Sequence, residues 1–335
     1  MEHFQISLGV ITLLVITALA FDFMNGFHDA ANSIATIVST RVLKPHQAVL
    51  WASAFNFVAY FVFPLTVATT IGKGTINPAI VDHYIIFGAL VGAIVWNIIT
   101  WYYGIPSSSS HALIGGLVGA AIAKVGPGGL IWAGVWKIVA FIFVAPLLGF
   151  AIGGLLMVAV SWLCRNTAPR RVDKTFRRFQ LISAAAYSLG HGGNDAQKTV
   201  GIIWMLLIAA GMTKAGETVP TWVVFACYSA MGLGTLFGGW RIVKTMGNRI
   251  TKLNQARGFC ANSGGAVTLF LATWLGIPVS TTHTITGAIA GVGSTRGTRR
   301  VRWGVAGGIV WAWLLTIPCS AAIAAVSWYL GRFFL

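Results

Sequence analysis

Long apolar runs separated by short polar stretches divide the chain into ten segments. Most of these runs approach the roughly 20 residues that an α-helix needs to cross a hydrocarbon core of about 30 Å. The pattern predicts an all-α, polytopic integral membrane protein with about ten crossings. The first, fifth, sixth and tenth segments are longer than one crossing requires, so we expect them to be broken or strongly tilted. The segments are 6–40, 46–70, 83–103, 106–124, 129–163, 180–211, 219–240, 258–274, 278–294 and 303–333.

The two halves of the chain repeat each other. The stretch "NGFHDAANS" in the first half is echoed by "GHGGNDAQKT" in the second, and "GIPSSSSHALIGGLVGA" is echoed by "GIPVSTTHTITGAIAGV". A shift of 172 residues relates Pro106 to Pro278 and Pro146 to Pro318. An odd number of crossings per half inverts the second copy, and inverted repeats with discontinuous helices are typical of secondary transporters. We expect a first membrane repeat in 1–164, a basic linker in 165–178 and an inverted second membrane repeat in 179–335, with paired re-entrant or broken segments.

Composition strengthens the membrane assignment. Of the 335 residues, 56% are hydrophobic and 9% are charged, whereas a soluble domain carries about 25% charged residues. The formal net charge is +16, but the positive side chains are grouped in short connections between apolar runs. That grouping follows the positive-inside rule rather than the pattern of a nucleic-acid-binding protein, so we expect no nucleic-acid partner.

The positions of the charges predict an orientation. With the central connection in the cytoplasm, most of the 23 Lys and Arg residues lie inside, next to anionic lipid headgroups. The protein is then a multi-pass protein of the cell (inner) membrane with both termini outside. The inner set comprises Arg41, Lys44 and the basic residues of 165–178, 241–257 and 296–302; the outer set is Lys73, Lys124, Lys214 and Arg332 with Glu2, Asp82 and Glu217.

Polar side chains recur along one face of the first segment, at Asn25, Asp29, Asn32 and Thr36. Their spacing is that of a helix face, and Gly26 marks an expected break that would free backbone carbonyls. A carboxylate at the bilayer centre is costly unless it is paired, protonated or bound to a cation. The stretch predicts either an ion or substrate site or a structural hydrogen-bond network, and its second copy favours the ion or substrate site. The predicted coupling-ion residues are Asn25, Asp29, Asn32, Asn194, Asp195 and Gln197.

The Gly-Ile-Pro elements lead into hydroxyl-rich stretches and then into apolar, glycine-rich runs. This order predicts two helices that begin within the membrane, with free N–H groups, the positive dipole end and hydroxyl donors at each start. Such a start binds anions, although ordinary N-capping at a loop gives the same pattern. Inversion would aim both starts at a common centre. The predicted anion-binding residues are Ser107, Ser108, Ser109, Ser110, Ser280, Thr281 and Thr282.

Other polar residues beside these motifs are candidates for accessory roles. The histidines show no HxxxH or HExxH spacing, so we expect no cofactor and no metal other than a sodium ion. A hydrogen-bonding or protonatable role suits the motif histidines better. Lys198 either pairs with Asp195 or faces the anion. The accessory candidates are Asp22, His28, Ser33, Asn56, His111, Lys198, Asn262 and His283.

These motifs resemble the inorganic phosphate transporter (PiT) family of phosphate:cation symporters, in its short bacterial form. Residues 26–33 are similar to the family signature G-A-N-D-x-A-N-S, residues 191–199 match its second copy, and both halves match the P-x-S-[ST]-[ST]-H element. The resemblance covers essentially the whole chain. It implies an inverted-repeat fold, phosphate held by the two Ser/Thr helix starts, and sodium or proton coupling at the Asn/Asp segments.

Two departures from the family pattern bear on coupling. His28 replaces the Asn of the first signature copy, and imidazole is a poor sodium ligand but a competent proton carrier, which favours protons. Asn56 and Asn262 stand where animal members of the family carry glutamate. A glutamate-based cation role therefore does not carry over to them, while neutral hydrogen bonding to the substrate does.

The sequence thus predicts a secondary active transporter, not an enzyme, that imports inorganic phosphate by alternating access in symport with H⁺ or Na⁺. The substrate is either free phosphate or a metal–phosphate complex. Sulfate is the nearest alternative, and a buried carboxylate facing the anion would favour phosphate, because phosphate donates a hydrogen bond and sulfate near neutral pH does not. An anion channel is a more distant alternative. A homodimer is compatible with the pattern, which does not decide the oligomeric state.

Overall fold

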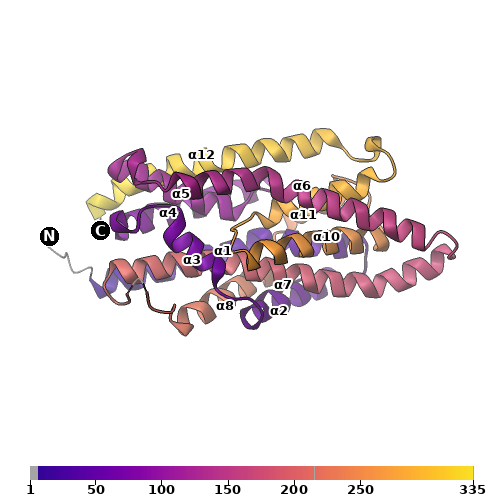
Figure 1. Ribbon diagram of the computed structural model, residues 1–335, viewed down its shortest axis with the longest axis horizontal. Coiled ribbons are helices and arrows are strands. Elements are labelled where there is room, and N and C mark those ends of the chain that lie inside the picture. Colours follow the sequence, from indigo (N-terminus) through magenta and orange to yellow (C-terminus); the bar gives the residue numbers. More distant parts are fainter. Residues whose placement is uncertain (1–6, 215, 335) are drawn as a thin grey trace.

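The computed structural model describes residues 7–214 and 216–334, and these form helices joined by short connections (Figure 1). Within those ranges the only β-type pairing is an isolated bridge between Ile76 and Leu130. The helices are α1 Leu8–Ser39, α2 Pro45–Val58, α3 Thr66–Gly74, α4 His83–Tyr103, α5 Ser109–Val125, α6 Trp132–Leu163, α7 Pro169–Ala209, α8 Thr221–Phe237, α9 Trp240–Asn248, α10 Gln255–Trp274, α11 Thr281–Ser294 and α12 Trp303–Phe334, with 3₁₀ turns at Ala59–Phe61, Pro78–Ile80, Pro127–Gly129 and Thr298–Arg300.

The helices of the two halves correspond one to one. Helix α5 packs against α12 as α11 packs against α6, and α4 contacts α12 as α10 contacts α6. In the same way α1 packs on α8 and α7 packs on α2, so each half supplies helices to the core of the other. The interleaved pairing confirms the prediction of two structural repeats in one polytopic, all-helical membrane protein.

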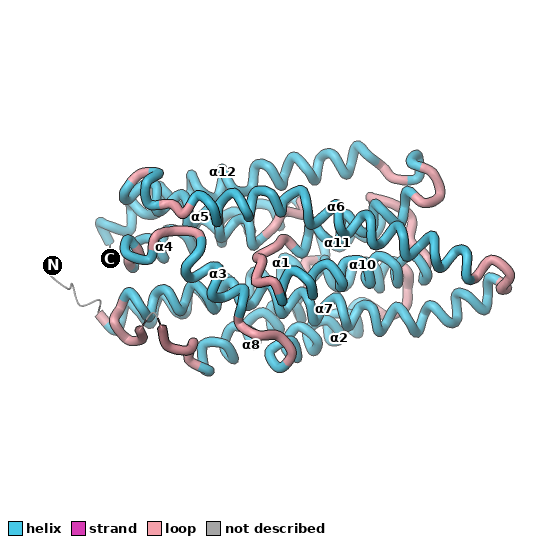
Figure 2. The backbone as a smooth tube through the Cα atoms, in the orientation of Figure 1, coloured by secondary structure: helices cyan, strands magenta, loops and turns pink. Residues whose placement is uncertain are grey.

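Two helical hairpins point toward each other from opposite ends of the molecule. At the base of the α4–α5 hairpin, Nζ of Lys124 lies 2.8 Å from Oδ2 of Asp82, so α5 ends where α4 begins. The α10–α11 hairpin opens at the other end, and both turns lie near the middle of the molecule (Figure 2). Each hairpin therefore returns to the end from which it started. The expectation of about ten crossings was too high, because an apolar run that turns back at the middle resembles a crossing in sequence.

The breaks in the helices lie elsewhere than expected. The α2–α3 pair is bent by 79° and the α8–α9 pair by 73°. By contrast α1, α6, α7 and α12 are continuous, and α6 and α12 keep Pro146 and Pro318 inside the helix. The four longest segments are therefore not broken, and the alternative expectation that they are strongly tilted stays a prediction. Four helices and the two bent pairs are long and apolar enough to span a membrane.

Gly26 lies inside the continuous helix α1 and does not break it. A Cβ atom at this position would fall on the backbone carbonyl of Met231 in α8. The equivalent glycine of the second half, Gly192 in α7, faces the carbonyl of Asn56 in α2 in the same way. The two glycines therefore allow α1 and α7 to pack closely against α8 and α2. Gly26 thus serves close helix packing and not the helix break that the sequence predicted.

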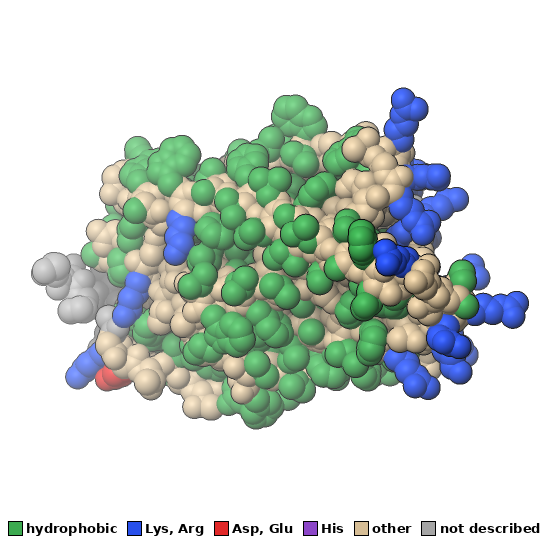
Figure 3. Space-filling view, turned by 45° about the vertical axis from the view of Figure 1, so that its right-hand side comes forward, with side chains coloured by type: hydrophobic (Ala, Val, Ile, Leu, Met, Phe, Trp, Pro, Cys, Tyr) green, Lys and Arg blue, Asp and Glu red, His purple; other side chains and the backbone are tan. Residues whose placement is uncertain are grey.

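Positive charge is concentrated at one end of the molecule, called the basic end here (Figure 3). It is formed by the α6–α7, α9–α10 and α11–α12 connections, and α12 ends at the opposite end (Figure 1). Most of the stretch predicted to be a linker, 165–178, is helical, because α7 begins at Pro169. Residues 1–6, which include Glu2, lie outside the described residues, and the orientation in the membrane stays a prediction.

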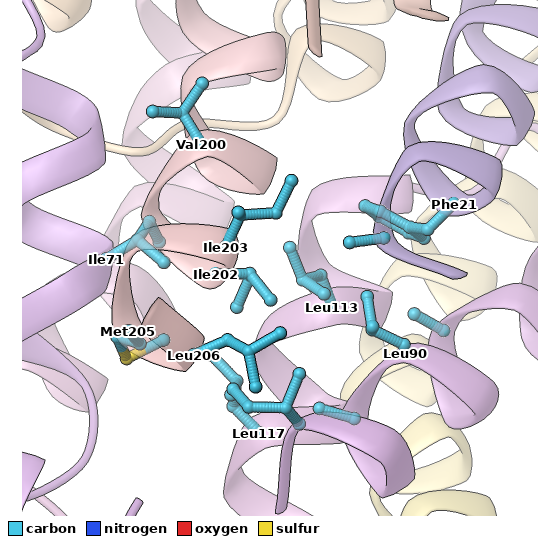
Figure 4. Packing of buried hydrophobic residues seen from close by; sticks show 14 of the residues in the cluster. Phe21, Ile71, Leu90, Leu113, Leu117, Val200, Ile202, Ile203, Met205 and Leu206 are labelled. Carbon is cyan, nitrogen blue, oxygen red and sulfur yellow. The ribbon is translucent and has the colours of Figure 1, made fainter. Parts of the chain in front are cut away.

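Two apolar cores lie on either side of a polar centre. One core, toward the end opposite the basic end, joins α1, α3, α4, α5 and α7 through residues such as Phe21, Leu113 and Ile203 (Figure 4). The other, toward the basic end, joins α1, α7, α10 and α11 through residues such as Ile34 and Ile289. Burial of these side chains stabilises the centre, where the polar residues of α1 and α7 meet the hairpin turns.

Candidate functional site

The starts of α5 and α11 meet at the polar centre. Ser108 and Ser280 are the N-cap residues, and their Oγ atoms accept hydrogen bonds from the backbone N–H groups of His111 and His283, each at 3.2 Å. This confirms the two predicted helix starts. The first-turn N–H groups of both helices have no partner within their own helix, so two positive dipole ends converge on one buried place.

Asp195 of α7 is fully buried and has four polar neighbours. Its carboxylate accepts from Nζ of Lys198 at 2.5 Å and from Oγ1 of Thr281 at 2.9 Å. Ser110 donates to it at 3.3 Å, and Nε2 of His191 lies 3.2 Å away. Because Ser110 lies in the first turn of α5 and Thr281 begins α11, the carboxylate links the two hairpin tips.

Asp29 occupies the equivalent position on α1. Its Oδ1 lies 2.6 Å from Nδ1 of His28 and accepts from Oγ of Ser109 at 3.3 Å. The other ring nitrogen of His28 is 3.1 Å from Oγ1 of Thr100 in α4, and Ser107 donates to the same threonine at 3.0 Å. Two of the predicted anion-binding serines therefore lie beside this pair, Ser109 in contact with Asp29 and Ser107 linked to His28 through Thr100.

Asn32 and Lys198 make equivalent contacts across the two repeats, each reaching the helix start of the other half. Nδ2 of Asn32 donates to Oγ1 of Thr282 at 2.9 Å and to that of Thr281 at 3.2 Å. Nζ of Lys198 donates to Oγ of Ser110 at 2.6 Å and to the carbonyl of Val279 at 2.7 Å. The sequence left open whether Lys198 pairs with Asp195 or faces the anion. In the structure Lys198 contacts both Asp195 and a hydroxyl group predicted to bind the anion, that of Ser110.

Two predicted coupling-ion residues make their contacts away from the Asp29–Asp195 pair. Oε1 of Gln197 accepts from the backbone N–H groups that start α3, at Val67 (3.0 Å) and Ala68 (3.3 Å), and its Nε2 donates to the carbonyl of Pro64 at 2.9 Å. Gln197 therefore fastens the α2–α3 bend to α7.

Asn194 holds the second hairpin tip. Its Nδ2 donates to Oγ1 of Thr273 and to the carbonyl of Ile277, both at 3.1 Å, and its Oδ1 accepts from Val279 N–H at 3.2 Å. Asn194 follows the same pattern as His28, since each contacts the threonine that precedes the turn of a hairpin. The two residues position the hairpin tips on α1 and α7.

Several accessory candidates extend the centre toward its flanks. Asp22 is completely buried, and neither of its oxygens has a hydrogen-bond partner among the described residues; the same holds for Oδ1 of Asn25. Nδ1 of His191 lies 3.3 Å from both Oγ of Ser33 and Oδ1 of Asn56. The contacts of His191 therefore join α1, α2 and α7 beside the centre.

The remaining accessory candidates lie at the interface of the hairpins. His111 and His283 are equivalent in the two repeats, and their ring centroids are 4.7 Å apart. Oδ1 of Asn262 accepts from Oγ1 of Thr36 at 2.8 Å, which ties α10 to α1. All three candidates are buried, and none of them contacts Asp29 or Asp195 by a hydrogen bond.

Some residues of the site were not singled out by the sequence reasoning. Thr100 and Thr273 support the two hairpin tips, and both belong to a Thr-Trp pair that precedes the Gly-Ile-Pro element. Aligning the halves beyond the motifs would have found them. Tyr187 donates to the carbonyl of Thr281 at 2.9 Å, and no sequence signal marks it.

The centre combines donors for an oxyanion with ligands for a cation. Ligand atoms of Asp29, His191 and Asp195 all lie within 4.8 Å of one another. Carboxylates and imidazole in this arrangement accept a proton or hold a small cation. The hydroxyl groups and helix starts beside them supply hydrogen-bond donors to an oxyanion. The centre therefore places hydrogen-bond donors suited to an anion beside ligand atoms suited to a cation.

Comparison with known proteins identifies the family. Residues 25–324 match the model of the phosphate transporter family. The chain is 60% identical over 316 residues to a probable low-affinity inorganic phosphate transporter of Rhizobium meliloti (strain 1021), covering 94% of this chain and 95% of that protein. It is 46% identical over 320 residues to a protein of the same description from Bacillus subtilis (strain 168), covering 95% and 96%.

The fold agrees with this similarity. A solved structure described as the sodium-dependent phosphate transporter matches with a TM-score of 0.89 and 26% identity, covering 98% of this chain and 100% of that one. The family match, the two relatives and the shared fold extend over nearly the whole chain. The protein therefore belongs to the phosphate transporter family.

Proposed function

We propose that this protein imports inorganic phosphate as a secondary active transporter that works by alternating access. The observation that carries the proposal is the meeting of two helix starts, from oppositely oriented hairpins, at the buried carboxylates Asp29 and Asp195. A tetrahedral oxyanion between these starts would receive hydrogen bonds from both repeats. A movement of one repeat against the other then opens the centre to one side at a time.

The charge of the centre supports coupling to a cation. Three buried carboxylates, Asp22, Asp29 and Asp195, are matched by one buried ammonium group, that of Lys198. If all four groups are ionised, an entering phosphate meets net negative charge in a region of low dielectric, where repulsion is strong. Co-binding of a proton or a sodium ion removes that repulsion, which makes anion entry dependent on the cation.

His28 supports the proton as the coupling ion. Its ring bridges Asp29 and Thr100, so a proton shared between imidazole and carboxylate changes the charge beside the serines of α5. A sodium ion is the second candidate, because the structural relative is described as sodium-dependent. The same centre supports transport of a metal–phosphate complex, since Asp29, His191 and Asp195 supply a metal-compatible set of ligands.

The carboxylates favour phosphate over sulfate. Asp29 and Asp195 accept hydrogen bonds from the hydroxyl groups of Ser109 and Thr281, so both carboxylates lie at the proposed anion site. Protonated phosphate can donate a hydrogen bond to such a carboxylate, whereas sulfate near neutral pH only repels it. A permanently open anion channel is disfavoured because both aspartates are buried, at 2% and 0% exposure.

The test is uptake of radiolabelled phosphate into vesicles that contain the purified protein. Sodium and pH gradients are imposed separately, with and without excess sulfate. We expect accumulation above the equilibrium level that depends on one of the gradients and resists sulfate. Accumulation that depends on neither gradient, or flux that only dissipates a phosphate gradient, would contradict the proposal. Effective competition by sulfate would assign the protein to sulfate instead.

A further inference from the structure

A pocket at the basic end lies between the α9–α10 and α11–α12 connections. Its volume is about 360 Å³, within the range of small-ligand sites. Thr251 Oγ1 donates to the carbonyl of Arg300 at 3.1 Å, and Arg302 N–H donates to the carbonyl of Ile250 at 3.0 Å, so the two connections are fastened together. The charged lining, called the basic pocket here, consists of Lys252, Arg257, Arg296, Arg299, Arg300 and Arg302.

Nothing within the described part of the chain neutralises this pocket. None of the ion pairs that residues 7–214 and 216–334 form involves its six cations. Arg257 is half-buried, its Nε atom is buried without a hydrogen-bond partner among these residues, and its Nη1 donates to the carbonyl of Lys252 at 2.7 Å. An anion from outside the chain would supply the partner that this guanidinium lacks.

The equivalent place in the first repeat shows what is missing. At the base of the α4–α5 hairpin, Asp82 caps α4 and pairs with Lys124 at 2.8 Å. The shift of 172 residues takes Asp82 to Asn254, which caps α10 through a hydrogen bond from Arg257 N–H at 3.1 Å. The same shift takes Lys124 to Arg296. The second hairpin thus keeps the cation and the cap but has an amide in place of the carboxylate.

We propose that the basic pocket binds an anion with two or more phosphoryl groups, which replaces the missing carboxylate at the base of the α10–α11 hairpin. Six positive side chains from two connections and the start of α10 favour a multivalent anion over a single monovalent ion. Phosphoryl groups meet that requirement as a soluble polyphosphate or as the headgroup of a diphosphorylated lipid. The bound anion ties the α11–α12 connection to the start of α10, as the Asp82–Lys124 pair ties α5 to α4.

The binding test uses the full chain, purified in detergent without anionic lipid, and sodium tripolyphosphate as the soluble probe. Calorimetric titration should detect binding that weakens at least about tenfold in the Arg257→Gln/Arg296→Gln variant, because two charge-assisted contacts are lost. The matched control is Arg170→Gln/Arg171→Gln, which removes the same charge from exposed positions at the start of α7. The control should bind like the parent protein.

A second variant supplies the missing carboxylate and keeps every arginine. Asn254→Asp retains a good N-cap residue and recreates the pair seen in the first repeat, so it should raise the melting temperature of the free protein and weaken tripolyphosphate binding. A lipid arm compares melting temperatures in vesicles of cardiolipin and of phosphatidylglycerol at equal charge. Stabilisation by cardiolipin alone, lost in the same variants, identifies a lipid headgroup as the source.

Three results would overturn the proposal. The first is the absence of binding by tripolyphosphate together with equal stabilisation by the two lipids. The second is equal weakening in the Arg170→Gln/Arg171→Gln control, which would mean general attraction to the basic end. The third is unchanged binding in Asn254→Asp. None of them touches the transport proposal, because the polar centre with Asp29 and Asp195 is intact in every variant.

Discussion

The contacts of Asp195 predict that the two central aspartates differ in what they contribute to stability. Replacing Asp195 by Asn leaves the buried ammonium group of Lys198 without its counter-charge, although its bonds to Ser110 and Val279 remain. Breaking a buried ion pair from one side costs about 3–5 kcal/mol. Replacing Asp29 by Asn weakens its contacts with His28 and Ser109, and because a histidine can become neutral the loss is about 1–3 kcal/mol.

The assay combines unfolding of the purified variants in detergent with phosphate uptake into vesicles. Both Asp29→Asn and Asp195→Asn should insert into the membrane and lose coupled uptake, but Asp195→Asn should unfold at a clearly lower temperature. The double variant Asp195→Asn/Lys198→Gln should regain most of the lost stability, since it buries no unpaired charge, and should stay inactive. A double-mutant cycle with Lys198→Gln then gives the coupling between the two residues.

Two outcomes would refute this reasoning. If Asp195→Asn were as stable as Asp29→Asn, the ion pair would not be the dominant contact of Asp195. If the double variant were no more stable than Asp195→Asn, the loss would not arise from an unpaired ammonium group. Normal concentrative uptake in either single variant would separately remove the coupling assignment, whatever its effect on stability.

Three further changes test other parts of the structure. Gly26→Ala should lower the melting temperature and uptake, because its Cβ would fall on the carbonyl of Met231, whereas Gly128→Ala, which faces open space, should leave both unchanged. His28→Asn restores the amide of the family signature and should shift the driving force from the pH gradient toward the sodium gradient in the vesicle assay; unchanged proton dependence would contradict the role given to the imidazole. Ser110→Ala should raise the KM for phosphate at least about tenfold through loss of a charge-assisted donor, and an unaltered KM would remove Ser110 from the anion site.

Much of the architecture could be predicted from the sequence because the same motifs occur in both halves of the chain. The repeated Gly-Ile-Pro elements located the two helix starts to within three residues, since the predicted segments began at 106 and 278 and the helices begin at Ser109 and Thr281. The inversion followed from the odd number of crossings expected in each half, and the positions of the charges agreed with it. The repeat did not reveal that the α4–α5 and α10–α11 hairpins turn back at the centre. A hairpin arm and a membrane crossing have similar length and apolarity, so the sequence does not distinguish them.

Sequence patterns are ambiguous where one residue type serves two purposes. Glycine both breaks helices and allows close packing, and at Gly26 only the neighbouring carbonyl of Met231 decides between these uses. The side-chain oxygen of Gln197 could bind a cation, but in the structure three backbone groups of the α2–α3 bend form hydrogen bonds with its amide. Such contacts depend on partners more than a hundred residues away, and local patterns carry no information about them.

The equivalence of Asn32 and Lys198 has a consequence for the energy landscape of the protein. Two chemically identical halves related by inversion would give outward-facing and inward-facing forms of equal free energy. Here the first half contacts the helix start of the second through the neutral amide of Asn32, whereas the second half contacts the helix start of the first through the ammonium group of Lys198. If the protein works by the alternating access proposed above, we therefore expect the two forms of the empty protein to differ in free energy, because only one half places an ammonium group at the centre.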